Sequence, residues 1–211
     1  MSDFHQNGVI STLHNLSNRS LGEIEQELRE YSKDVPIELI LPSLYSELEG
    51  VALKNIVSCL SNVKYLNHIT IGLDKADKSE FIKAKKFFSN LNQPHSVIWN
   101  DSPKMKKLDS DFKKLGIAPN QSGKGKNVWY CMGYTYSRNE AGSVALHDCD
   151  ITTYNRELLA RLVYPVSNPH FNYEFCKGYY PRIREGTLSG RVTRLLVTPL
   201  LKTFKKVLGH R

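Results

Sequence analysis

Apolar residues recur along the chain at two different spacings. Short, mostly apolar runs of the kind that form buried strands occur at residues 37–42, 69–73, 96–99 and 143–146. Elsewhere apolar residues return once per helical turn, which predicts amphipathic helices. These helical patterns cover residues 21–32, 50–63, 79–90, about 103–115 and about 126–137. Strands that alternate with helices predict βαβ units, and hence an α/β fold with a mostly parallel sheet flanked by helices.

Two of these elements carry terminal signals. Ser20 precedes the first helix and Glu23 follows three residues later, which is the spacing of a capping box. Pro42 predicts that the first strand ends at that residue. A further basic, amphipathic pattern at about 191–208 predicts a last helix that packs on the sheet, with a position on a membrane surface as the alternative.

The composition is that of a globular protein. The chain has 211 residues, of which 40% are hydrophobic and 24% charged, and this excludes a disordered or collagen-like chain. It contains neither an apolar run long enough to cross a membrane nor the pattern of a signal peptide. The four cysteines form no Cys-x-x-Cys pair, which argues against a structural zinc site and a disulfide framework. We therefore expect a cytoplasmic protein with reduced thiols and no stable membrane insertion.

The positive charge lies almost entirely at the C-terminal end. Residues 181–211 hold eight lysines and arginines and one acid, which supplies +7 of the formal net charge of +8. A basic tail can meet nucleic acid, an anionic membrane or a phosphorylated small molecule, and charge alone does not choose among them. Because the first 180 residues are nearly neutral and carry no groove-reading motif, we expect no nucleic-acid partner.

The sharpest chemical feature is His147-Asp148-Cys149-Asp150, directly after the apolar run 143–146. Ligands of parallel sheets bind beyond the carboxyl ends of the strands. Two carboxylates one residue apart at such an end can hold Mg²⁺ or Mn²⁺, which would bridge a diphosphate and stabilise its departure. The alternative interpretation is an acidic loop that closes the strand or caps the next helix.

A second feature is the loop Ser122-Gly123-Lys124-Gly125-Lys126-Asn127 before a predicted helix. Glycines let backbone N–H groups approach a phosphate, and a helix N-terminus adds positive potential. The loop is not a Walker A motif, because that motif's first glycine would fall at Ala118 and Gly125 stands where it has Ser or Thr. The alternative is a flexible basic loop.

Two further segments could contact a ligand. The segment 41–47 (LPSLYSE) ends the first strand and could hold a nucleobase and ribose through backbone groups and the ring of Tyr45. The segment 190–193 (GRVT) could bind a phosphate or carboxylate, because a guanidinium binds oxyanions through two parallel hydrogen bonds. The alternative for the segment 41–47 is a strand exit turned by proline, and the alternative for the segment 190–193 is the solvated start of a basic helix.

Five segments of the chain together carry a resemblance to a known family and are, in order, LPSLYSE, GKGKNVW, ALHDCDI, FCKGYYPRI and SGRVTRLLVTPLL. Through them the chain resembles the glucosyl-3-phosphoglycerate synthases, which are retaining glycosyltransferases of the GT-A fold. The likeness covers roughly residues 36–205, and its specificity lies in the ordered set. It implies a helical extension at 1–35, a GT-A-like (Rossmann-like) domain that binds a nucleotide-sugar at 36–190, and a basic helical start of the acceptor region at 191–211.

The resemblance also implies roles for particular residues. Pro42, Ser43, Leu44 and Tyr45 match the loop that lies against the nucleoside of the donor. Lys124, Asp148 and Cys149 match residues that contact the nucleotide, and Asp150 matches the direct metal ligand. Gly190, Arg191, Val192 and Thr193 match the segment that grips the phosphate of the acceptor.

The sequence departs from the family pattern in three places. Tyr45 stands where the family usually has asparagine, and the segment 71–77 (IGLDKAD) keeps acids but lacks the usual serine. The choice between uridine and guanosine as the donor base therefore stays open. Asp74 and Lys75 lie in the second of these segments, and the resemblance assigns them no specific role. Family members also continue well beyond the equivalent of Arg211, and that segment supplies a histidine metal ligand. We expect this chain to correspond to the donor-binding half.

Together, these matches imply a metal-dependent glycosyltransferase. It would move a hexosyl group, expected to be glucosyl, with retention from a nucleotide-sugar such as UDP-glucose to a small phosphorylated or carboxylated acceptor such as 3-phosphoglycerate. Mg²⁺ or Mn²⁺ on Asp150 would stabilise the departing diphosphate, and no catalytic nucleophile is evident. The alternative is a truncated nucleotide-binding module without turnover. The oligomeric state stays open, with a homodimer among the options.

Overall fold

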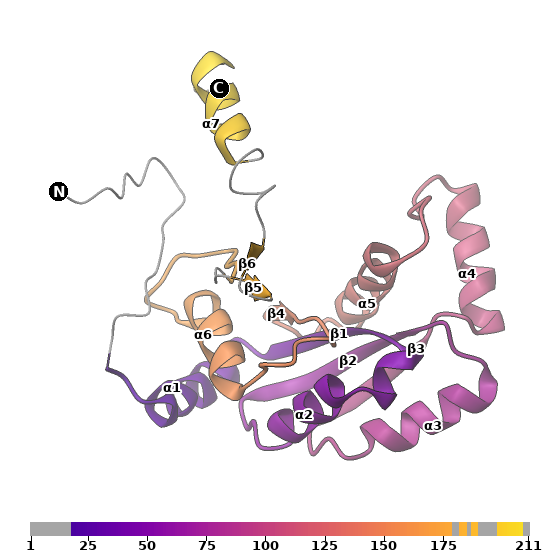
Figure 1. The fold of residues 1–211 in the computed structure, drawn as a ribbon, viewed down its shortest axis with the longest axis horizontal. Coiled ribbons are helices and arrows are strands. Elements are labelled where there is room, and N and C mark those ends of the chain that lie inside the picture. Colours follow the sequence, from indigo (N-terminus) through magenta and orange to yellow (C-terminus); the bar gives the residue numbers. More distant parts are fainter. Residues whose placement is uncertain (1–17, 179–181, 185–186, 190–197, 209–211) are drawn as a thin grey trace. The chain divides into compact units, whose positions relative to one another are not determined.

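The computed structural model describes residues 18–178, 182–184, 187–189 and 198–208 (Figure 1). The chain divides into two compact units, residues 1–176 and 177–211. The helices and strands of the first unit are α1 (Leu21–Asp34), β1 (Ile37–Leu44), the 3₁₀ helix η1 (Tyr45–Glu49), α2 (Val51–Leu60), β2 (Leu66–Asp74), α3 (Lys78–Phe88), β3 (His95–Trp99), α4 (Pro103–Lys114), α5 (Lys124–Arg138), β4 (Ser143–Leu146) and α6 (Arg156–Ser167).

The second unit contains the antiparallel pair β5 (Arg182–Arg184) and β6 (Thr187–Ser189), followed by α7 (Thr198–Leu208). The predicted last helix is confirmed for its described part, residues 190–197 lie outside the described residues, and the packing of this helix on the sheet stays a prediction. The domain boundaries predicted at residues 35 and 190 stay predictions. In the described ranges, no helix is long and apolar enough to cross a membrane.

The first unit is built on a four-stranded sheet with the order β3-β2-β1-β4. Every neighbouring pair in this sheet is parallel, and Leu39 of β1 pairs with both Ile69 of β2 and Ala145 of β4. The carboxyl ends of the strands therefore lie along one edge. This arrangement confirms the α/β fold that the alternating pattern predicts.

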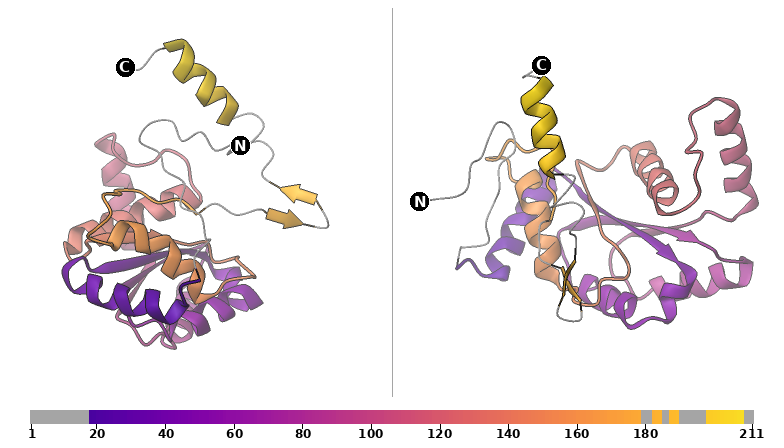
Figure 2. Two further views of the ribbon diagram at one scale, coloured as in Figure 1. Left: turned by 90° about the vertical axis from the view of Figure 1, so that its left-hand side faces the viewer. Right: turned by 45° about the horizontal axis from the view of Figure 1, so that its top comes forward.

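The two faces of the sheet differ in chemistry. One face carries apolar side chains, such as Leu39 and Ile71, that join the hydrophobic core with α1, α2, α3 and α6. The other face lies under α5 (Figure 2) and is polar: the buried carboxylate of Glu38 accepts hydrogen bonds from the hydroxyls of Thr70 and Thr135. Helix α5 is thus held by directional hydrogen bonds, whereas the opposite face is held by apolar burial.

A close contact fixes the first turn of α5 to the sheet. The side-chain amide of Asn127 donates to the carbonyl of Gly72 at 2.9 Å, and Asn127 is almost fully buried. A Cβ on Gly72 would lie 1.8 Å from the Asn127 Oδ1 and 2.5 Å from the Cys131 Sγ. The lack of a side chain at residue 72 is therefore what lets α5 approach β2 here.

Of the two predictions made from signals at the ends of elements, one is confirmed and one is wrong. The capping box is confirmed, because the Ser20 hydroxyl accepts from the Glu23 amide and the Glu23 carboxylate accepts from the Ser20 amide. The prediction that β1 ends at Pro42 is wrong, since the strand runs on to Leu44. The Ile40 carbonyl accepts from His147, so alternate residues of β1, including Pro42, turn their backbone polar groups toward β4. Strand β4 pairs only as far as Ile40, and Pro42 costs no ladder hydrogen bond.

Two helices differ from the sequence pattern. Helix α5 starts at Lys124 rather than at about 126, so its first turn includes the lysine of the Gly-Lys-Gly loop. The sequence analysis missed α6 altogether. A signal for it exists, because the Asn155 side chain caps its first turn by accepting from the Leu158 amide at 2.9 Å.

We predict that Gly72→Ala lowers the free energy of unfolding by at least about 2 kcal/mol, because the added methyl group overlaps Asn127. Gly133→Ala is the matched control: it lies within α5 with open space at its Cβ, and should stabilise the protein by about 0.5–1 kcal/mol. Chemical denaturation measures both changes. Equal stabilities of the Gly72→Ala variant and the wild type would contradict the contact.

Candidate functional site

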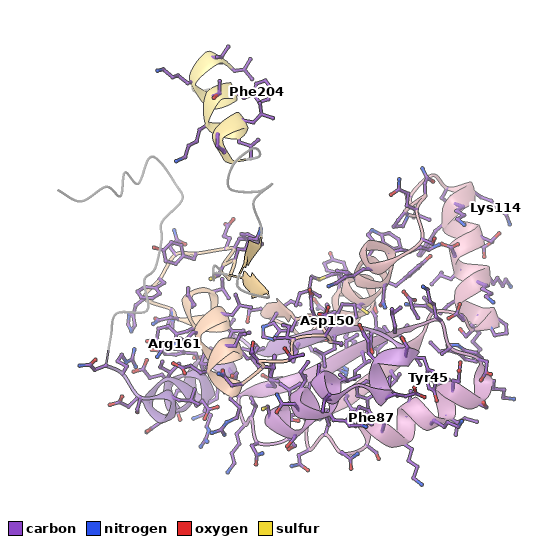
Figure 3. All side chains as sticks on the ribbon, in the orientation of Figure 1. Tyr45, Phe87, Lys114, Asp150, Arg161 and Phe204 are labelled. Atoms are coloured by element: carbon purple, nitrogen blue, oxygen red, sulfur yellow. The ribbon has the colours of Figure 1, made fainter. Side chains whose placement is uncertain are left out.

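Polar segments follow β1, β2, β3 and β4 at their carboxyl ends, on the edge where α5 begins. Residues 42–47 end β1 and begin η1, Asp74 ends β2, Asn100 follows β3, and Asp148 to Asp150 follow β4. The parallel pairing of β1 with β4 brings residues 42–47 and 148–150 to the same edge. The sequence-predicted donor and metal segments thus lie along one edge of the sheet (Figure 3 labels Tyr45 and Asp150).

The residues after β4 alternate between the inside and the outside of the protein. Cys149 is buried, whereas Asp150 is exposed and the Asp148 side chain is about half exposed. The Cys149 thiol contacts the Ser43 hydroxyl, and its burial together with the charge of Glu47 raises its pKa. The two carboxylates therefore face solvent on either side of an inward-pointing thiol.

His147 is part of the fold's interior. Its ring packs edge-on against Tyr154, a residue of the hydrophobic core, and its Nδ1 lies 3.1 Å from the Tyr154 hydroxyl. Burial lowers the pKa of His147 to about 4, so the ring is neutral at physiological pH. His147 thus packs in the interior, while its two neighbouring carboxylates are accessible.

The Gly-Lys-Gly loop contacts the acidic segment directly. Gly123 precedes α5 with a φ of 124°, a left-handed conformation that favours glycine. Lys124 is the first residue of α5, and its ammonium forms an ion pair with the carboxylate of Asp148. Two residues that the sequence analysis selected from separate motifs are therefore in contact.

The second lysine of this loop has a different role. The ammonium of Lys126 lies 2.5 Å from the Asp109 carboxylate, which also accepts from the Tyr130 hydroxyl at 2.6 Å and pairs with Lys113 at 2.9 Å. Hydrogen bonds from Lys126 and Tyr130 hold the pKa of Asp109 well below its usual range. Lys126 thus joins α4 to α5.

The exit of β1 is ordered by its own acidic residue. The Glu47 carboxylate accepts from the Leu44 amide at 2.8 Å, which closes the turn into η1. Ser43 is buried, and Leu44 and Tyr45 are partly exposed. A ligand at this loop could thus meet backbone groups and the Tyr45 ring, while the Ser43 side chain stays inside.

Asn100 and Asn127 belong to the same edge; the sequence analysis missed Asn100 and named Asn127 only as the last residue of the glycine-lysine loop. The Asn100 amide donates to the Asp74 carboxylate at 2.7 Å, and burial raises the pKa of Asp74. Asn127 contributes to the same edge through its hydrogen bond to the Gly72 carbonyl, two residues before Asp74. A sequence signal exists for Asn100, because it follows directly after β3, and for Asn127, because it follows the Gly-Lys-Gly loop.

The donor set fits an open cation site rather than a closed one. No group of three or more His, Cys, Asp or Glu side chains able to hold a metal occurs within the part of the chain that the structure describes. Asp148 and Asp150 offer two accessible carboxylates after β4. Mg²⁺ and Mn²⁺ accept such a set when water and a substrate phosphate complete the coordination shell. The predicted acceptor residues Gly190, Arg191, Val192 and Thr193 lie outside the described residues.

We predict that Cys131 and Cys149 resist alkylation by iodoacetamide at about pH 8, whereas Cys59, which is partly exposed, reacts. Burial raises the pKa of the Cys131 thiol to about 12 and that of Cys149 further, so neither forms the reactive thiolate. Mass spectrometry of peptides identifies the modified residues, and denatured protein is the control in which all four cysteines react. Rapid modification of Cys149 in the native protein would contradict the inward orientation of this thiol.

Comparison with known proteins identifies relatives over nearly the whole chain. No family model matches. A glucosyl-3-phosphoglycerate synthase of Persephonella marina is 47% identical over 99% of this chain, and one of Methanococcoides burtonii is 36% identical over 96%. These alignments cover 52% and 50% of the two relatives, so the chain spans about half their length.

Solved structures support the same fold. The glucosyl-3-phosphoglycerate synthase of Mycobacterium tuberculosis in complex with Mn²⁺, UDP and glucosyl-3-phosphoglycerate matches 94% of this chain and 58% of its own, with a TM-score of 0.54 and 18% identity. Its complex with Mn²⁺ and UDP-glucose gives a TM-score of 0.53 at 17% identity. The chain is therefore a relative of the glucosyl-3-phosphoglycerate synthases, has the GT-A-like fold predicted from its sequence, and corresponds to about half of their length.

Proposed function

We propose that this protein binds a nucleotide-sugar through a divalent cation and transfers a glucosyl group, with retention, to a small anionic acceptor such as 3-phosphoglycerate. The observation that carries the proposal is the contact between Lys124 and Asp148 at the carboxyl edge of the sheet. It joins a cationic loop at a helix N-terminus to an accessible acidic segment, which is the pairing that a metal-bound diphosphate requires. The curated relatives, both named glucosyl-3-phosphoglycerate synthase, support the choice of sugar and acceptor.

The predicted residues that the structure describes have roles compatible with their exposure. Asp150 is exposed and would ligate the cation, whereas Cys149 and Ser43 are buried and would meet the nucleotide through backbone groups. Lys124 and Asp148 would contact the nucleotide with their side chains. The partly exposed Leu44 and Tyr45 would form the nucleoside wall, with the buried Pro42 behind them. Gly190, Arg191, Val192 and Thr193 would hold the acceptor phosphate.

The reaction proposed here depends on charge rather than on a covalent intermediate. When bound, Mg²⁺ or Mn²⁺ would neutralise the negative charge that develops on the departing diphosphate. The chain's own contribution is to hold Asp150 at the exit of β4 and to present Lys124 and the N–H groups of α5 to the phosphates. We assign no nucleophile.

A second candidate function is nucleotide binding without turnover. The contact between Lys124 and Asp148 supports it equally, because both residues are expected to meet the nucleotide rather than the acceptor. Such a module would bind donor and cation as above but would leave 3-phosphoglycerate unchanged.

We also propose a cytoplasmic location for the protein, because its four cysteines are free thiols.

We predict that UDP-glucose binds in the presence of Mn²⁺ and that Asp150→Ala weakens this binding by at least about tenfold, or about 1.4 kcal/mol. The reason is the loss of the direct cation ligand. Isothermal titration calorimetry with Mn²⁺ and with EDTA measures the effect. Asp111→Ala, which removes the same charge from a half-exposed position on α4, is the control and should bind as the wild type does.

The two candidate functions are separated by incubating the protein with UDP-glucose, Mn²⁺ and 3-phosphoglycerate. Transfer with retention gives a product whose anomeric coupling constant in NMR matches that of the donor. Donor binding without product would leave the binding module as the function. Failure of both UDP-glucose and GDP-glucose to bind would contradict the proposal.

A further inference from the structure

Lys124 and Asp148 satisfy each other's charge in the ligand-free protein. Lys124 starts α5 and Asp148 follows β4, so the pair joins two elements across the candidate site. Their side chains are 54% and 45% exposed. An ion pair with this much solvent contact is weak and exchanges readily with other charged groups.

Lys126, two residues further along the same helix, gives a direct comparison. Its side chain is only 20% exposed, and that of its partner Asp109 is 17% exposed. Tyr130 and Lys113 hold the same Asp109 carboxylate, so the Lys126 contact belongs to a network. The loop thus contains one lysine fixed within the fold and one lysine held by an exchangeable contact with the acidic segment.

The position of Lys124 has a consequence for a cation. The ammonium neutralises the carboxylate of Asp148, two residues before Asp150, and a divalent cation approaching these carboxylates meets a positive charge. A nucleoside diphosphate offers the ammonium another anion of higher charge. Once Lys124 moves to a phosphate, Asp148 is released.

We propose that Lys124 couples the binding of the two ligands. In the free protein its ammonium pairs with Asp148 and weakens divalent-cation binding. When a diphosphate binds, the ammonium pairs with a phosphate instead, and the acidic segment becomes available to the cation. This proposal rests on the proposed function, since it presumes that cation and diphosphate share this site. Because such coupling is reciprocal, the cation strengthens diphosphate binding by the same factor. A solvent-exposed pair of this kind accounts for a change of about two- to fivefold in cation affinity.

The test is a titration of the full chain with Mn²⁺, in which the free ion is measured by electron paramagnetic resonance. The wild type is compared with Lys124→Met, Lys124→Arg and Lys126→Met, each without nucleotide and with saturating UDP. Lys124→Met removes the charge, whereas Lys124→Arg keeps it. Lys126→Met removes the same charge from the lysine that Asp109 holds.

Without nucleotide, Lys124→Met should bind Mn²⁺ about two- to fivefold more tightly than the wild type. This gain should be smaller in saturating UDP, because Lys124 has then left Asp148 in the wild type. Lys124→Arg should bind as the wild type does. Asp150→Ala confirms that the signal comes from this site if it removes the binding, and circular dichroism confirms that each variant is folded.

Three results would overturn the proposal. The first is an Mn²⁺ affinity of Lys124→Met that does not exceed that of the wild type, including the absence of measurable binding in both. The second is an equal gain in Lys126→Met, which would indicate a general effect of charge. The third is a gain that is just as large in saturating UDP although calorimetry shows that UDP binds.

Failure of the proposed function gives a different pattern. If neither UDP nor GDP binds any variant in the presence of Mn²⁺, the shared donor site is wrong. The comparison of Lys124→Met with the wild type in Mn²⁺ alone still decides whether Lys124 hinders the cation. The two claims therefore fail on separate measurements.

Discussion

The parallel pairing of β1 with β2 on one side and β4 on the other is the constraint on which the candidate site depends. It places the exit of β1, near residue 44, and the exit of β4, near residue 148, on one edge although they are far apart in the sequence. Helix α5 then adds its N-terminus to that edge, because Asn127 binds the Gly72 carbonyl. Without this sheet geometry, the acidic segment and the Gly-Lys-Gly loop would have no reason to meet.

The polar layer between α5 and the sheet is the unusual element of the packing. A buried carboxylate, that of Glu38, costs free energy unless its hydrogen bonds are satisfied, and Thr70 and Thr135 supply them. Arg138 contacts the ring of His68 at 2.8 Å near the end of the same helix. Since such bonds are directional, they fix the position of α5 more strictly than apolar contacts would. A well-placed α5 in turn sets the position of Lys124.

Much of this arrangement could be predicted from the sequence. The alternating apolar patterns gave the order of strands and helices through β4, and the capping box at Ser20 gave the start of α1. The acidic and glycine-rich motifs identified Asp148 and Lys124 but did not predict their contact. That contact depends on the strand order and on where α5 packs on the sheet. Asn127 could not be recognised as a clamp, because its importance comes from a glycine on a neighbouring strand. The prediction from Pro42 was wrong for a similar reason, because the length of β4 decides whether a proline at residue 42 of β1 is tolerated.

The central claim is that a metal-bound diphosphate occupies the edge between β4 and α5. The most direct measurement is a crystal structure of this chain with Mn²⁺ and UDP, using the anomalous signal of manganese. We expect a manganese peak coordinated by the Asp150 carboxylate, with the diphosphate between it and the N-terminus of α5. A peak away from Asp150, or a diphosphate that does not contact the first turn of α5, would contradict this claim.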